Sequence, residues 1–123
     1  MIPTGRFTLI HQLQGGGPVH APVDIDETYS VSISGRTGIL GFIFQVGDTN
    51  RVSMAMADRL MVVSYAGDLA PDAEAAPDGP IMGGRMASLD SSGRGSSGTW
   101  SLFPESVFQA DLEGSVFPDR DDG

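Results

Sequence analysis

Residues 38–65 read GILGFIFQVGDTNRVSMAMADRLMVVSY, and this stretch decides the fold because it holds the densest run of large apolar side chains and no proline. In an extended strand, successive side chains point to opposite faces. Both faces of residues 39–46 are then largely apolar, with Leu40, Phe42, Phe44 and Val46 on one and Ile39, Gly41, Ile43 and Gln45 on the other. We expect this stretch to form the centre of the hydrophobic core.

Two alternating runs follow, over residues 52–56 and 61–65. Apolar side chains recur there at every second position, which is the period of a strand. A tight hairpin would turn between the runs, at Asp58-Arg59. A helix over residues 50–63 is the alternative, because a capping residue precedes it and Met, Ala, Arg and Leu are good helix formers. We favour the hairpin.

Strand-like segments on either side bring the expected total to about eight. The additional strands are residues 6–14, 27–34, 81–89, 99–103 and 106–113. Glycine and proline stand at the joints, and the predicted loops are residues 15–26, 67–80 and 90–98. Short strands joined mostly by short turns are typical of an all-β fold. We predict a small antiparallel β-barrel, with a β-sandwich as the alternative.

Two local expectations accompany this fold. The segment 27–34 and the strand after it, residues 39–46, are separated by a short turn and should be hairpin neighbours. The acidic, proline-rich loop over residues 67–80 lacks the apolar side chains that would offset the entropy of ordering it. We expect this loop to be mobile and to lie over one end of the sheet.

The composition bounds the class of protein. The chain has 123 residues, no cysteine, no lysine and a net charge of −9. We predict one β domain over residues 1–118 and a disordered acidic tail over residues 119–123. The acidic surface argues against nucleic acid as a partner, and no apolar run approaches the length of a membrane span. Because no signal peptide is recognisable, we expect a cytoplasmic protein.

Three residues are candidates for catalysis. His11 lies on the apolar side of the first expected strand, where a barrel interior would hold an imidazole as a general acid, a base or a polarising group. A core histidine with satisfied nitrogens is the alternative. Tyr29 and Tyr65 would offer hydroxyls to a buried polar atom of a ligand. His11 and His20 lack the H-x-H or H-E-x-x-H spacing of a metal site, so we expect neither metal nor cofactor.

The candidate ligand-binding residues are large and apolar. Methionine side chains are flexible and polarisable, so a surface rich in them adapts to irregular hydrophobic molecules, although methionines also fill ordinary cores. Aromatic rings add large contact areas. The set is Phe42, Phe44, Met54, Met56, Met61, Met86 and Trp100.

Two functions from different classes fit this sequence. The first is binding of a hydrophobic small molecule in the barrel lumen, with cyclase or isomerase chemistry that works by shaping the substrate as a further step. The second is a non-enzymatic protein-interaction or assembly module. Homo-oligomerisation is compatible with either, and the sequence does not decide whether the protein is an enzyme. A lumen of roughly a few hundred cubic ångströms favours binding, and a packed interior favours the module.

Overall fold

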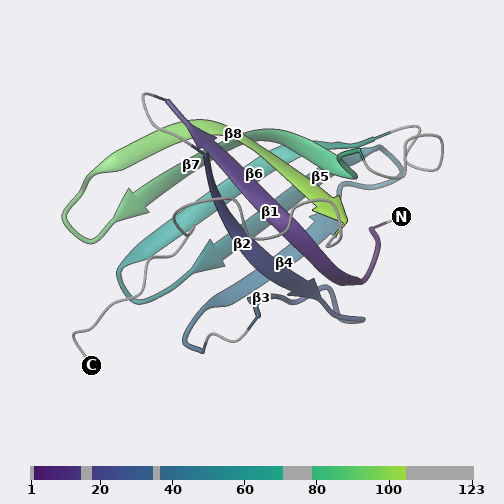
Figure 1. The fold of residues 1–123 in the computed structure, drawn as a ribbon, viewed down its shortest axis with the longest axis horizontal. Coiled ribbons are helices and arrows are strands. Elements are labelled where there is room, and N and C mark those ends of the chain that lie inside the picture. Colours follow the sequence, from purple (N-terminus) through teal and green to yellow (C-terminus); the bar gives the residue numbers. More distant parts are fainter. Residues whose placement is uncertain (1, 15–17, 35–36, 71–78, 105–123) are drawn as a thin grey trace.

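The computed structural model describes residues 2–14, 18–34, 37–70 and 79–104. Every regular element in these ranges is a β-strand, as Figure 1 shows. The strands are β1 (Gly5–Leu13), β2 (Pro18–Ile25), β3 (Val31–Ile33), β4 (Leu40–Gln45), β5 (Arg51–Ala57), β6 (Met61–Leu69), β7 (Met82–Asp90) and β8 (Gly95–Pro104). The predicted all-β class is confirmed.

The strands form one antiparallel sheet that closes almost completely into a barrel. Its order is β3-β2-β1-β8-β7-β6-β5-β4, so the chain runs as a meander and β8 returns to pair with β1. The edge strands β3 and β4 meet at a bridge between Ser30 and Phe42. Beside this bridge, the Ile43 amide donates a hydrogen bond to the Tyr29 carbonyl at 2.9 Å. The predicted barrel is confirmed, and the sandwich alternative is wrong.

Inward-facing side chains fill the middle of the barrel. Period-two alternation places large apolar residues from all eight strands on the inner face, where each is less than a tenth exposed, and Ile39 of the loop before β4 is buried with them. Burying a side chain of this size stabilises the fold by about 1.5–3 kcal/mol relative to leaving it exposed. The largest members are Leu9, Val23, Val31, Ile43, Met54, Met56, Val63, Tyr65, Met82, Trp100 and Leu102.

Glycines beside Trp100 give its ring space against the sheet. Gly84 lies between Gly67 of β6 and Trp100 of β8 in the strand ladders. A side chain at Gly84 would collide with the Ala66 carbonyl. That same carbonyl accepts a hydrogen bond from the Trp100 indole N–H at 3.1 Å. The glycines therefore let the indole reach the backbone two strands away.

Residues 50–63 form a hairpin, as favoured, and the helical alternative is wrong. β5 pairs with β6 along its whole length. Asp58 stabilises the turn, because its Oδ1 atom accepts hydrogen bonds from the Leu60 and Met61 amides at 2.8 Å each. The Asp58 amide in turn donates to the Met61 carbonyl at 3.0 Å. Pairing on both sides of the hairpin outweighs the helix propensity of its methionines and alanines.

The prediction that residues 15–26 form a loop is wrong, because residues 18–25 form β2. Proline is rare inside sheets since it cannot donate to a ladder. Pro22 costs the sheet no hydrogen bond to β1, because the backbone polar groups of this residue face away from β1. The Pro22 carbonyl accepts a hydrogen bond from the Ser34 amide at 2.9 Å. Backbone N and C=O groups of one strand residue point in the same direction, so the missing N–H also faces away from β1.

Three further boundaries differ from the prediction. The strand expected over residues 27–34 is only the three residues of β3. Its expected hairpin with residues 39–46 is reduced to the bridge between Ser30 and Phe42. The loop expected over residues 67–80 begins later, since Gly67–Leu69 belong to β6. The connector expected over residues 90–98 is shorter, since β8 begins at Gly95. In β6 and β8, pairing with neighbouring strands overrides the low strand propensity of glycine and serine.

Several expectations lie outside the described residues. These are the mobility of residues 71–78, the strand over 106–113, the domain boundary at 118 and the acidic tail over 119–123.

Candidate functional site

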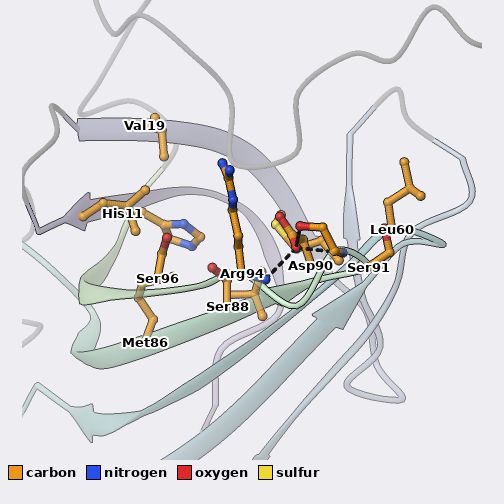
Figure 2. A pocket seen from close by; sticks show the side chains of 13 residues that line it. His11, Val19, Leu60, Met86, Ser88, Asp90, Ser91, Arg94 and Ser96 are labelled. Carbon is orange, nitrogen blue, oxygen red and sulfur yellow. Dashed lines mark hydrogen bonds between the residues drawn. The ribbon is translucent and has the colours of Figure 1, made fainter.

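A pocket of about 470 Å³ opens at one end of the barrel. Its walls come from the ends of β1 and β7, the starts of β2, β6 and β8, and the β5–β6 and β7–β8 turns, and Figure 2 shows these side chains. The volume lies in the usual range of ligand pockets, about 300–1,000 Å³. The lining residues are His11, Leu13, Val19, Leu60, Met61, Val63, Met86, Ser88, Asp90, Ser91, Ser92, Arg94 and Ser96.

His11 reaches the pocket from the packed interior of the barrel. Its Nε2 atom lies 2.6 Å from the Tyr65 hydroxyl, and the two ring centroids are 5.1 Å apart. Tyr65 packs edge-on against Trp100 at a centroid distance of 5.3 Å. The contacts between the rings of His11, Tyr65 and Trp100 therefore continue from the pocket into the core.

Both members of the His11–Tyr65 pair are neutral at pH 7. Burial lowers the pKa of His11 to about 4, because the charged imidazolium loses its hydration. Burial raises the pKa of the Tyr65 phenol well above its ordinary value for the same reason. The hydrogen bond between them therefore joins an uncharged imidazole to an uncharged hydroxyl.

The β7–β8 turn forms the rim of the pocket and is held by Asp90. The Asp90 Oδ1 atom accepts hydrogen bonds from the Ser92 hydroxyl at 2.6 Å, the Ser92 amide at 3.0 Å and the Arg94 amide at 2.9 Å. These bonds, led by that of the Ser92 hydroxyl, hold the pKa of Asp90 below its ordinary value. The Ser91 amide donates to the Leu60 carbonyl at 2.8 Å, which ties this turn to the β5–β6 turn.

The turn between β2 and β3 repeats this pattern at the opposite end of the barrel. Asp26 Oδ1 accepts from the Thr28 amide and hydroxyl and from the Ser30 amide, as Asp90 does from Ser92 and Arg94. The fourth residue has a positive φ in both turns, 62° at Tyr29 and 89° at Gly93. An L-residue with a side chain rarely adopts this conformation.

Arg94 supplies the positive charge of the pocket. Figure 2 shows its side chain extended from the β7–β8 turn along the pocket. Asp90 is the acidic residue of the lining, and its carboxylate attracts the guanidinium. No ion pair joins the Arg94 guanidinium to a carboxylate within the described ranges.

The structure brings some of the predicted site residues together. Met61 and Met86 line the pocket with His11, and Tyr65 contacts His11 from below. Three other predicted residues are buried in the adjoining core and do not line the pocket: Met54, Met56 and Trp100.

Three predicted residues lie away from the pocket. Phe42 and Phe44 point outward from β4, with exposed fractions of 53% and 47%, and stack on each other at 5.9 Å. The expectation that they face a lumen is corrected: both faces of β4 are apolar, and Ile43 is the residue that the closed barrel turns inward. Tyr29 is in the β2–β3 turn, at the end of the barrel opposite the pocket.

Sequence reasoning missed the polar residues of the pocket. Ser88 and Ser96 belong to inward-facing positions of β7 and β8, and Arg94 directly precedes the second of these strands. Period two, continued from Met82 through Met86, would have placed Ser88 on the inner face. No comparable pattern marked Arg94, because it lies in the stretch of serine and glycine that we predicted to be a connector.

Neither a metal cluster nor a membrane-spanning helix is found in the parts of the chain that the structure describes. No group of three or more His, Asp or Glu side chains there could hold a metal ion. No helix among those residues is long and apolar enough to cross a bilayer.

The fold and the pocket define an eight-stranded antiparallel β-barrel with a binding-sized pocket at one end. Comparison of the chain with protein-family models, with curated proteins and with solved structures gave no match.

Proposed function

We propose that this protein binds a hydrophobic small molecule in the pocket at the end of the barrel. The observation that carries the proposal is the pocket itself, which is about 470 Å³ in volume and has a mostly apolar wall. Ligand sites in proteins combine such a wall with a few placed polar groups. Here the polar groups include the imidazole of His11, the hydroxyls of Ser88 and Ser96, and the charged side chains of Asp90 and Arg94.

The His11–Tyr65 pair fits ligand binding better than general-base catalysis. Catalysis that works by holding the substrate in a reactive shape is also compatible with the pair. A base whose pKa is about 4 has little affinity for a proton at neutral pH. The pair can still offer a hydrogen bond to a polar ligand atom at the bottom of the pocket. A cyclase or isomerase in this site would therefore act by holding a flexible ligand in a reactive conformation.

Titration with the neutral fluorophore N-phenylnaphthylamine tests the proposal. We expect saturable binding to the wild-type protein, with the blue-shifted emission of an apolar site. Ser88→Phe should abolish it, because Ser88 lines the pocket and a benzyl group there would occupy the space. Ser64→Phe is the matched control, since Ser64 is exposed on β6 and does not line the pocket. Absence of saturable binding to the wild type, or equal binding to Ser88→Phe, would overturn the proposal.

An assembly module is the second candidate, and one observation favours it. The outer face of β4 and the residue that follows the strand carry a stripe of exposed apolar side chains: Leu40, Phe42, Phe44 and Val46. β4 is also an edge strand of the sheet. Exposed apolar stripes at sheet edges are common contact sites for other chains.

Sedimentation of the wild type and of the double variant Phe42→Ser/Phe44→Ser over a range of concentrations tests this second candidate. Self-association that grows with concentration and disappears in the variant would support it. A wild-type protein that stays monomeric at every concentration would count against self-assembly through this stripe.

A further inference from the structure

We propose that the ligand of the end pocket is an amphipathic organic acid, whose apolar body fills the pocket and whose carboxylate pairs with Arg94. This inference rests on the proposed function, since it names the ligand class of the same site. Three observations carry it: the place of the arginine, the polarity of the wall around it and the size of the pocket.

Arg94 is placed to meet an anion. Its guanidinium lines a pocket whose other contributors on the β1, β2 and β6 side are apolar or uncharged, and no ion pair with a described carboxylate occupies it. An arginine fork recognises carboxylates through paired hydrogen bonds. Asp90 attracts the guanidinium, but its Oδ1 atom is already filled by three hydrogen bonds from the turn. Among the residues that the structure describes, the Arg94 side chain makes no ion pair, so its donors can meet a ligand there.

The wall changes from apolar to hydroxylic toward the arginine. One side of the pocket is apolar and is formed by Leu13, Val19 and Val63. The hydroxyls lie near Arg94: its own turn carries Ser91 and Ser92, and the strands that flank this turn carry Ser88 and Ser96. Figure 2 shows Arg94 with Ser88 and Asp90 around its base. A ligand with one apolar end and one charged end would match this gradient, whereas a wholly apolar ligand would leave the hydroxyls and the guanidinium without partners.

The volume sets the size of the acid. If each non-hydrogen atom with its hydrogens takes about the 30 Å³ share of a water molecule, a pocket of about 470 Å³ holds roughly 15 such atoms. A medium-chain fatty acid or a compact isoprenoid acid has this size. Longer acids would extend out of the open end.

Competition between two ligands with the same chain tests the inference. Dodecanoate and dodecanol are each titrated at pH 7 against the protein with N-phenylnaphthylamine, and the ratio of their affinities measures recognition of the carboxylate. We expect the wild type to prefer dodecanoate by about three- to tenfold at low salt, because the ion pair is partly exposed. Added salt should reduce the preference.

Two arginine variants test whether Arg94 causes the preference for dodecanoate. Arg94→Gln should bring the ratio close to one. Arg85→Gln is the matched control: it removes the same charge from an exposed position of β7 that does not line the pocket, and the ratio should stay as in the wild type. Equal affinities for the two ligands in the wild type, or an equal loss in both variants, would overturn the inference.

The same titrations separate this inference from the function on which it rests. If the dye and dodecanol bind but dodecanoate has no advantage, only the acid is wrong. If neither the dye nor either ligand binds, the proposed function fails and the inference fails with it.

Discussion

Acidification should destabilise this protein through His11 well before its carboxylates are protonated. The folded pKa of His11 is about 4, against 6.5 for an unperturbed histidine, and the cause is burial. Above pH 6.5 the imidazole is neutral in both states. Between pH 6.5 and 4 the unfolded chain binds a proton that the folded chain does not, so the free energy of unfolding falls as the pH falls. Below pH 4 both states are protonated and the His11 contribution levels off.

The size of this loss follows from the two pKa values. Each unit of difference is worth about 1.4 kcal/mol, so the gap between 6.5 and about 4 corresponds to a loss of about 3 kcal/mol. Asp24, Asp26 and Asp90 have folded pKa values below their ordinary 3.8. Their stabilising contributions are lost only as the pH falls through and below that value. The histidine and carboxylate windows are therefore separate.

Urea unfolding followed by Trp100 fluorescence measures the effect, because Trp100 is the one tryptophan of the chain and is 2% exposed. His11→Gln keeps a polar group that can bond Tyr65 and removes the titration. The difference in unfolding free energy between wild type and His11→Gln should shrink by about 3 kcal/mol from pH 7 to pH 4. Ser64→Gln, an exposed control on β6 that removes no titratable group, should retain the wild-type slope. Parallel curves for wild type and His11→Gln over this range would refute the reasoning.

Three further changes have defined outcomes in urea or thermal unfolding. Tyr65→Phe leaves the buried His11 Nε2 atom without its partner and should lower the free energy of unfolding by about 1–3 kcal/mol; an unchanged midpoint would contradict the 2.6 Å bond. Gly93→Ala places a side chain at a φ of 89° and should cost about 1 kcal/mol, whereas a neutral result would show that the turn relaxes. On β4, Ile43→Ala should cost about 2–5 kcal/mol and Leu40→Ser about 0.5 kcal/mol or less, and similar losses would mean that the inner face has been misassigned.

Much of the barrel could be predicted from local pattern. The alternation in residues 6–14, 52–56 and 61–65 predicted β1, β5 and β6, and the short turns predicted an antiparallel barrel. Strand periodicity depends on nearest neighbours in the chain, so it is visible without the fold. The sequence analysis missed β2 because it used local patterns alone. A proline counts against a strand locally, and only the neighbouring strands decide whether the missing N–H of Pro22 is needed.

The candidate site was only partly predictable. His11, Met61 and Met86 were chosen for their chemistry and their face of the strand, and the structure places all three in one pocket. Phe42 and Phe44 were chosen on the same grounds and lie outside, since a strand with two apolar faces gives no local sign of which one turns inward. That choice depends on the direction in which the whole sheet curves.

The sequence by itself determined the all-β class, the acidic surface without lysine or cysteine, and most of the strand pattern, because these properties follow from residue type and short-range spacing. Only the tertiary structure decided where the pocket lies and that Arg94 and the serines share it with His11. Residues 11 and 94 are far apart in the chain, and they come together because β8 closes the barrel against β1. Closure is a property of all eight strands together, so no single segment of the sequence carries it.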